Sequence, residues 1–291
     1  MNRLSGLLMS FMIICLANLQ LSAQSRVEDG VLNSKILSAD RSYTVLLPND
    51  YDKEPDKKYP ILYLLHGMTE TNRIWFDRGH VKDIMDQLTA SGEAIDIIIV
   101  APNAGGRFED DAWNGYFDMP GWKYETFFFE EFLPFIESKY RVIGNKQNRA
   151  IAGLSMGGGG ATGYAQHHSD KFCAVYAMSA LMTIPGSAAQ HFDNPKDKFA
   201  ILTMSVIENS CVKYVDEADD NCRRQLSTIN WYVDCGDDDF LLNRNIEFIH
   251  AMRKAQIPVE FRVRDGGHTW EYWHSALYKC LPFVSNSFRD N

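Results

Sequence analysis

The sequence predicts an α/β fold in which a mostly parallel central sheet is covered by helices on both faces. Two runs, residues 61–65 and 95–100, are almost continuously apolar, which is typical of strands buried on both faces of a parallel sheet. Strand-like and helical patterns also alternate along most of the chain, as parallel strands joined by crossover helices require. This regular alternation favours one domain over two.

The remaining elements follow from local periodicity, taken in chain order. Alternating runs at 31–37 and 42–47 predict the two antiparallel strands of a hairpin ahead of the first buried strand. Helical spacing and short apolar runs then place the other elements. They are helix 81–88, helix 124–140, strand 149–152, helix 157–167, strand 174–178, strand 229–234, helix 241–255, strand 259–263 and a final helix at 271–283.

One segment, residues 183–228, breaks this rhythm. Pro185, Gly186 and aspartate-rich stretches at 193–197 and 216–220 interrupt it. We interpret it as an irregular insertion over one end of the sheet, within a single catalytic domain that spans residues 24–291. A lid or substrate-shaping role and a surface excursion without function are both open at this point.

The first 23 residues have the pattern of a signal peptide. Arg3 supplies the positive start, residues 7–17 form an apolar run too short to span a bilayer comfortably, and small residues at 21–23 precede a cut near Gln24. An uncleaved membrane anchor is the alternative. We therefore expect an exported protein, periplasmic or secreted, without a membrane segment once the signal is removed.

Charge and cysteine content narrow the function classes. The formal net charge of −9 and a pI near 5.4 argue against nucleic-acid binding, which needs a basic face. No CxxC or Cys/His spacing indicates a metal site, and no cofactor is expected. Cys211 and Cys222 flank a short acidic loop, and an exported protein can keep such a pair oxidised. Whether the two are bridged is open.

Ser155 is the candidate nucleophile because Gly153-Leu154-Ser155-Met156-Gly157 matches the G-x-S-x-G pattern. A predicted strand enters the pattern and a predicted helix leaves it, which is the nucleophile elbow of α/β-hydrolases. Glycines on each side relieve the crowding of the sharp turn. The strand, turn and helix together predict the α/β-hydrolase fold.

A serine hydroxyl needs a general base, and the base needs an orienting carboxylate. In α/β-hydrolases these follow in the order serine, acid, histidine. Of the late histidines, His268 follows a strand at the carboxyl end of the sheet, whereas His250 and His274 lie in or beside predicted helices. The acid should follow strand 229–234, where composition alone does not choose among the aspartates at positions 237, 238 and 239.

The tetrahedral intermediate needs backbone N–H donors where negative charge develops. The N–H of Met156, the residue after the nucleophile, should be one. Met68 should supply the second, since Gly67 allows a tight loop after strand 61–65. We interpret His66 as a structural histidine that lines the site.

Two aromatic clusters flank the predicted site. The loop after the strand at 95–100 carries Trp113, Tyr116 and Trp122 among glycines and aspartates, and we expect these three to form a substrate wall. The second cluster, Trp270 to Trp273, is expected to lie in the core.

The chain resembles the putative-esterase (esterase D-like) family of α/β-hydrolases, which includes feruloyl and acetyl xylan esterases, S-formylglutathione hydrolases and mycolyltransferases. The resemblance implies that Asp239 is the acid, and it supports the roles expected for Ser155, His268 and Met68. It covers about residues 42–283. The motifs that carry it are LLHG at 64–67, YETF at 124–127 with YRV at 140–142, GLSMGG at 153–158, CGDDD at 235–239 and GGH at 266–268 with Trp273.

The resemblance, together with the signal peptide, implies the carbohydrate-esterase branch of the family. The expected function is that of an exported serine carboxylic-ester hydrolase that removes feruloyl or acetyl groups from plant polysaccharides. The expected partner is therefore an acylated carbohydrate. An acyltransferase that passes the acyl group to a sugar hydroxyl, and a non-catalytic carbohydrate-binding homologue, are the alternatives.

Overall fold

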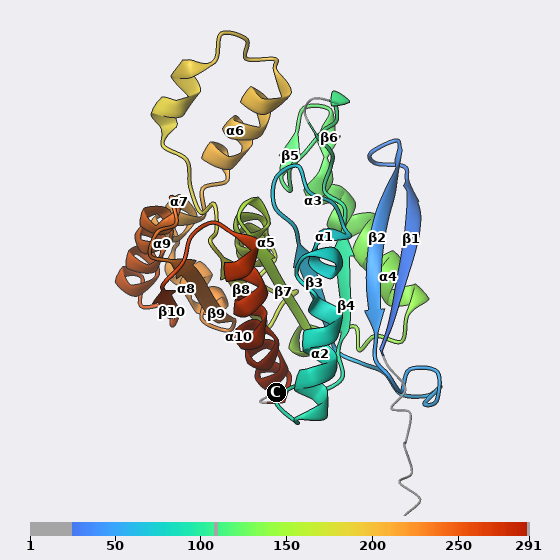
Figure 1. Ribbon diagram of the computed structural model, residues 1–291. Coiled ribbons are helices and arrows are strands. Elements are labelled where there is room, and N and C mark those ends of the chain that lie inside the picture. The colour runs from blue at the N-terminus through green and yellow to red at the C-terminus, as the bar shows by residue number, and fades with distance from the viewer. Residues whose placement is uncertain (1–24, 108–109, 290–291) are drawn as a thin grey trace, which may run out of the picture.

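An eight-stranded sheet forms the centre of the computed structural model, which describes residues 25–107 and 110–289; the predicted signal segment lies outside these residues (Figure 1). The strand order is β1-β2-β4-β3-β7-β8-β9-β10, with the pairs β1/β2 and β2/β4 antiparallel and the other pairs parallel. The predicted mostly parallel sheet is therefore confirmed. The strands are β1 (Arg26–Ser34), β2 (Ala39–Leu47), β3 (Ile61–Leu65), β4 (Ile98–Pro102), β7 (Arg149–Leu154), β8 (Ala174–Met178), β9 (Asn230–Gly236) and β10 (Glu260–Arg264), and a separate small hairpin pairs β5 (Asp118–Met119) with β6 (Trp122–Lys123).

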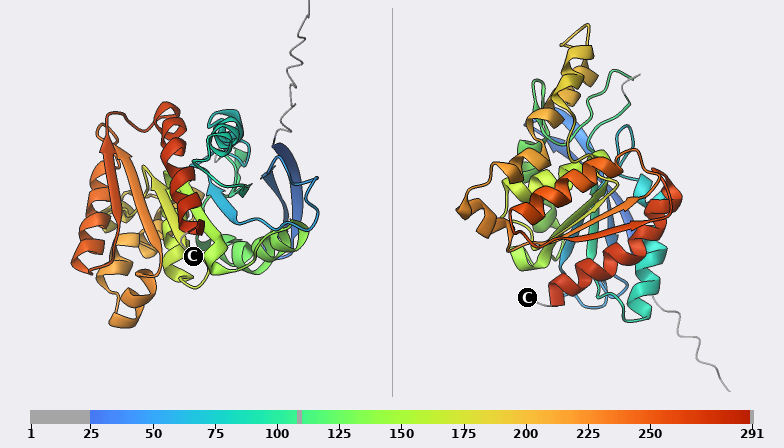
Figure 2. Two further views of the ribbon diagram at one scale, coloured as in Figure 1. Left: turned by 90° about the horizontal axis from the view of Figure 1, so that it is seen from below. Right: turned by 90° about the vertical axis from the view of Figure 1, so that its left-hand side faces the viewer.

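Helices cover both faces of the sheet, and the sheet separates two core clusters, one on each face (Figure 2). One face packs against α1 (Ile74–Asp77), α2 (Val81–Ala90) and α10 (Trp270–Arg289). Within the described residues, none of the helices combines the length and apolar character that a membrane span needs. The helices on the other face are α3 (Tyr124–Phe127), the π-helical turn η2 (Phe128–Phe132), α4 (Leu133–Lys139), α5 (Met156–His167) and α9 (Leu242–Lys254).

Most predicted elements agree with the structure to within a few residues, but the final helix, predicted at 271–283, continues to Arg289. The strands expected at 61–65 and 174–178 have the same bounds as β3 and β8. The first strand of the hairpin is displaced from the predicted 31–37, because β1 spans Arg26–Ser34 and residues 35–38 form the turn. All nine residues of β1 pair with β2, although much of β1 is exposed and carries a weak hydrophobic pattern. Patterns of burial therefore locate the central strands more accurately than the edge of the sheet.

The insertion at 183–228 is more regular than predicted. It contains the short 3₁₀ segment η4 (Gly186–His191), then α6 (Lys198–Glu208), α7 (Cys211–Asp216) and α8 (Asp220–Leu226). A second 3₁₀ segment, η3 (Lys146–Asn148), lies outside the insertion and precedes β7. Asp197, Ser210 and Asp219 each accept a hydrogen bond from a backbone N–H in the first turn of the helix that follows. These polar residues are N-caps, so the two aspartate-rich stretches, which indicated loops, each contain the start of a helix.

The cysteine pair considered above is not bridged in the structure. Cys211 is buried at the start of α7 and its thiol lies 3.5 Å from the carbonyl oxygen of Gly159, while Cys222 is half-buried on α8. Both thiols are free. Since burial raises the pKa of Cys211 to about 12, its thiol stays protonated and is a poor nucleophile.

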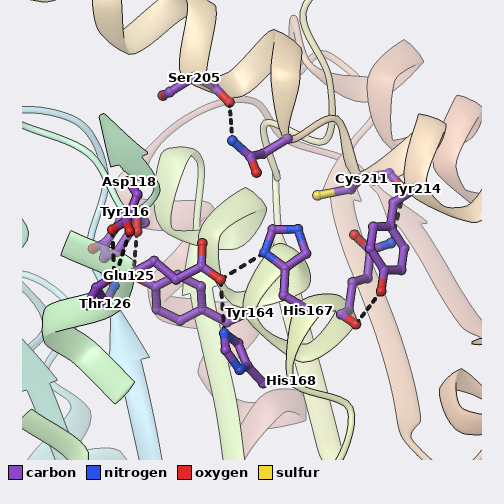
Figure 3. A network of polar contacts seen from close by, with 12 residues as sticks. Tyr116, Asp118, Glu125, Thr126, Tyr164, His167, His168, Ser205, Cys211 and Tyr214 are labelled. Carbon is purple, nitrogen blue, oxygen red and sulfur yellow. Dashed lines mark hydrogen bonds and ion pairs between the residues drawn. The ribbon is translucent and has the colours of Figure 1, made fainter. Parts of the chain in front are cut away.

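A polar network fastens the far end of α5 to its surroundings (Figure 3). Glu125 Oε1, at the start of α3, accepts hydrogen bonds from His167 Nδ1 at 2.8 Å and His168 Nε2 at 3.0 Å. Tyr214 on α7 donates to the carbonyl oxygen of Gln166 at 2.8 Å. The helix that begins at the serine elbow is therefore tied to two neighbouring helices at its other end.

Candidate active site

Ser155 occupies a strained turn between β7 and α5. Its φ of 53° and ψ of −120° lie in a region that non-glycine residues rarely adopt, and such strain costs of order 1–3 kcal/mol. Its backbone N–H donates to Met178 O at 2.9 Å. A Cβ at Gly157 would come within 2.5 Å of the carbonyl oxygens of Leu65 and His66, so a glycine is required there. The turn therefore has the geometry of the predicted nucleophile elbow.

The structure brings together the three residues that the sequence predicts as nucleophile, base and acid. His268 Nε2 lies 3.0 Å from Ser155 Oγ, and His268 Nδ1 lies 2.9 Å from Asp239 Oδ2. With the proton on Nδ1, the imidazole donates to the carboxylate and accepts from the serine hydroxyl. The alternative histidines lie elsewhere, since His250 is exposed on α9 and His274 bonds to a backbone carbonyl before α2.

Asp239 is held in place as an ionised carboxylate. It is buried, and Oδ1 accepts a hydrogen bond from Leu241 N–H at 2.8 Å. Burial raises the pKa of this carboxyl, but the hydrogen bonds from His268 and Leu241 outweigh that effect and leave the pKa below its usual value. The negative charge needed to orient the imidazole is thus present at neutral pH.

The two neighbouring aspartates, Asp237 and Asp238, contact Gly266 rather than His268. Asp237 Oδ1 accepts from Gly266 N–H at 3.0 Å, and Asp238 N–H donates to Gly266 O at 3.0 Å. These contacts join the loop after β9 to the loop after β10. The side chains of Asp237 and Asp238 are exposed, whereas Asp239 points inward to His268.

Met68 and Met156, the two residues expected to donate backbone N–H groups to an oxyanion, both lie beside Ser155. Met156 is the first residue of α5, and Met68 follows the end of β3 by three residues. Both residues line one cavity with Ser155. Among the described residues, neither N–H has a hydrogen-bond partner. Unpaired backbone donors can stabilise an oxyanion, and the helix start at Met156 also favours negative charge.

His66 is a buried structural residue beneath this loop. Its Nδ1–H donates to Gly67 O at 2.7 Å, and its Nε2 accepts from Ala104 N–H at 2.9 Å. Burial lowers the pKa of His66 to about 4, so the imidazole is neutral at physiological pH. It is not among the residues that line the cavity beside Ser155, contrary to the expectation that it lines the site.

An apolar cavity of about 160 Å³ opens beside Ser155. Helix α6 of the insertion contributes four of its lining residues, at positions 199, 202, 203 and 206. This i, i+3, i+4, i+7 spacing is a sequence signal for one helix face, and it could have predicted the helix. The cavity is lined by Met68, Ser155, Met156, Leu181, Ile184, Phe199, Leu202, Thr203, Val206, Phe240 and Leu241.

The predicted aromatic wall does not reach this cavity. Tyr116 and Trp122 are buried, and their polar atoms bond to the carbonyl oxygens of His66 and Gly115. Trp113 is half-buried and stacks on Trp122 with the ring centroids 6.5 Å apart. Tyr116 and Trp122 are therefore core residues, contrary to expectation. The cluster at 270–273 is buried as predicted.

Comparison with known proteins identifies the family. A family model described as putative esterase matches residues 34–284. A solved structure of a ferulic acid esterase is 67% identical, covers 91% of this chain and 99% of its own, and superposes with a TM-score of 0.88. The acetyl esterase of Caldicellulosiruptor saccharolyticus is 23% identical over 87% of this chain and 95% of its own length.

Endo-1,4-beta-xylanase Y of Acetivibrio thermocellus is 32% identical over 85% of this chain. This chain spans only 22% of that relative, so the likeness concerns one part of a longer protein. The relatives matched over nearly their full length are named as esterases, which argues against the non-catalytic alternative. The chain therefore belongs to the putative-esterase family of α/β-hydrolases and is a serine carboxylic-ester hydrolase.

Proposed function

We propose that this enzyme is exported and removes feruloyl or acetyl groups from plant polysaccharides, with Ser155 as nucleophile, His268 as base and Asp239 as the residue that orients the base. One observation carries the proposal. The 3.0 Å contact between Ser155 Oγ and His268 Nε2 lies at the wall of an apolar cavity that can hold an acyl group.

In the acylation step, Ser155 Oγ attacks the ester carbonyl carbon while His268 Nε2 accepts the hydroxyl proton. The carbonyl oxygen becomes an oxyanion, and the N–H groups of Met68 and Met156 donate to it. When the tetrahedral intermediate collapses, the bond to the alcohol oxygen breaks. His268 returns its proton to that oxygen, which releases the alcohol and leaves the acyl group on Ser155.

Deacylation repeats the sequence with water. His268 accepts a proton from the water as the water oxygen attacks the acyl carbon, and the same two N–H groups stabilise the second oxyanion. Collapse returns the proton to Ser155 Oγ and frees the carboxylic acid. Asp239 stays ionised throughout and stabilises the imidazolium.

The size of the cavity favours an aromatic acyl group over acetyl. A dry cavity of about 150 Å³ lined by aliphatic and aromatic side chains is large enough to bind benzene. The cavity beside Ser155, at about 160 Å³, is of that size and is lined almost entirely by apolar groups. A feruloyl ring would fill it, whereas an acetyl methyl group would leave most of it empty. The high identity to a ferulic acid esterase supports the same choice.

Three exposed apolar side chains surround the mouth of the cavity and support an aromatic substrate. Met68, Phe199 and Phe240 are 43%, 44% and 74% exposed and all line it. Phe240 also packs against the His268 ring at 4.5 Å. Exposed apolar groups gathered at one opening are typical of a binding site.

Export and a polysaccharide substrate rest on other observations. The first 23 residues carry the signal pattern, and relatives include proteins named as xylanases. We take residues 24–291 as one catalytic domain that acts on the acylated carbohydrate outside the cytoplasm.

The test compares wild type with Ser155→Ala on methyl ferulate and p-nitrophenyl acetate. We expect Ser155→Ala to lose at least about 10³-fold in kcat, since it removes the nucleophile, and Ser138→Ala on the exposed face of α4 to match wild type. Equal turnover by Ser155→Ala would reject the mechanism. Adding a sugar acceptor separates hydrolysis from acyl transfer, and fractionating the producing cells shows whether the chain is exported.

A further inference from the structure

Glu70 is a half-buried carboxylate beside the site that takes no part in the proton transfers above. Its two oxygens accept from two different donors. Gly67 N–H donates to Oε2 at 2.9 Å, and the indole Nε1–H of Trp270 donates to Oε1 at 2.9 Å. One carboxylate therefore joins the loop after β3 to the start of α10.

These two donors adjoin the two groups that must cooperate in catalysis. Gly67 precedes Met68, whose N–H is the proposed oxyanion donor, and Trp270 follows His268 by two residues. The hydrogen bonds of Glu70 thus link Gly67, next to the proposed oxyanion donor, with Trp270, two residues after the proposed base.

The loop that Glu70 fastens has little freedom of its own. Thr69 adopts a φ of 64°, which costs a non-glycine residue about 1 kcal/mol or more. A Cβ at Gly67 would lie 2.8 Å from Leu154 Cδ1 and 2.9 Å from Glu70 Oε2, so this backbone is packed directly against the carboxylate. A strained conformation persists when its surroundings determine it, and Glu70 is part of those surroundings.

A carboxylate suits this position better than an amide. Both neighbours are donors, and an ionised carboxylate offers only acceptors, whereas a glutamine would turn its NH₂ group toward one of them. Burial raises the pKa of Glu70, and the hydrogen bonds from Gly67 and Trp270 offset this rise in part. Because both oxygens accept from N–H donors, the hydrogen-bond pattern is that of an ionised carboxylate.

We propose that Glu70 is a positioning residue that sets the oxyanion donor at Met68 relative to the base His268, by accepting hydrogen bonds from Gly67 and Trp270 at once. This inference rests on the proposed function, because Glu70 acts only through Met68 and His268, whose catalytic roles that function assigns. The affected quantity is stabilisation of the tetrahedral state, and substrate binding in the apolar cavity is left unchanged.

The experiment measures kcat, KM and the affinity for an arylboronic acid, which forms a tetrahedral adduct on the serine and so reports oxyanion stabilisation. Glu70→Gln should lower kcat and boronate affinity about tenfold, with KM within about twofold of wild type. Trp270→Phe, which keeps an aromatic ring beside Trp75, should have a smaller effect.

The double variant provides the sharper result. Once Trp270→Phe removes the indole donor, the NH₂ group of a glutamine at position 70 no longer faces it, so Glu70→Gln should cost less in that background. If Glu70→Gln alone does not fold, comparing the double variant with Trp270→Phe still measures the effect of the glutamine. Additive losses, or boronate affinity and kcat within twofold of wild type in Glu70→Gln, would overturn the inference. If Ser155→Ala is inactive while Glu70→Gln is normal, this inference fails and the proposed function stands.

Discussion

At the residue scale, the proposed catalytic acid, Asp239, differs from the neighbouring aspartates in its surroundings. Asp239 is buried and hydrogen-bonded to His268, while Asp238 is exposed one position earlier. In the proposed mechanism, the carboxylate of Asp239 keeps the imidazole in the tautomer that can accept the proton of Ser155. Both residues belong to the same short loop, so they form a matched pair for mutation.

We expect Asp239→Asn to lower kcat by about 10⁴-fold and Asp238→Asn to change it less than twofold. The asparagine keeps the shape of the side chain, but its amide no longer holds the proton on His268 Nδ1. Steady-state kinetics on methyl ferulate measure both values. A similar loss in the two variants would mean that the loop as a whole, rather than one carboxylate, is needed.

The sequence predicted the serine and the histidine from their context, whereas the acid required the resemblance. Burial distinguishes Asp239 from its neighbours, and burial within a turn leaves no periodic signal.

The prediction that the aromatic loop forms a substrate wall is wrong because burial in a loop likewise leaves no periodic signal. A Cβ at Gly160 or Gly163 would come within 2.7 Å of the rings of Tyr116 or Phe117. The glycines of α5 thus make room for these rings, so the loop packs inward.

At the element scale, α6 forms part of the cavity wall. Its residues at 199, 202, 203 and 206 face the cavity, while Ile207 on the same helix does not line it. The Lys198 side chain also bonds to Asp111 at 2.6 Å, which ties the first turn of α6 to the opposite loop. The substrate-shaping interpretation is therefore favoured over a surface excursion.

Enlarging one lining residue of α6 should narrow the choice of acyl group. We expect Val206→Phe to lower kcat/KM for methyl ferulate about tenfold or more relative to p-nitrophenyl acetate, since the added ring occupies space that the feruloyl ring needs. Ile207→Phe is the control and should leave the ratio unchanged. An unaltered ratio in Val206→Phe would show that the acyl group binds elsewhere.

The insertion also shows the limit of local patterns. Aspartates and serines favour both turns and helix N-caps, because the same side-chain oxygen accepts a backbone N–H in either setting. At Asp197, Ser210 and Asp219 the helix follows, and the apolar face of α6 was the signal that could have decided. Central strands such as β3 and β8 were predicted well because burial on both faces leaves an unbroken apolar run.

At the scale of the whole molecule, acid stability depends on which buried groups must take up protons. His66 directly follows the end of β3 and is fully buried and neutral. Its hydrogen bonds use Nδ1 as donor and Nε2 as acceptor, so the folded chain has no place for a second ring proton. The unfolded chain binds that proton with the ordinary pKa of 6.5, whereas the folded chain binds it only near 4.

The sign of the effect follows from this difference. Above pH 6.5 both states are neutral and the full stability is present; as the pH falls from 6.5 towards 4, the unfolded state gains a proton that the folded state lacks, and stability is lost. At about 1.4 kcal/mol per pKa unit, the loss amounts to about 3 kcal/mol. Urea unfolding of wild type and His66→Gln at pH 7 and pH 4 should show this loss in the free energy of unfolding in wild type alone. The exposed His250→Gln should keep the wild-type slope, and equal pH slopes in wild type and His66→Gln would mean that other groups control acid unfolding.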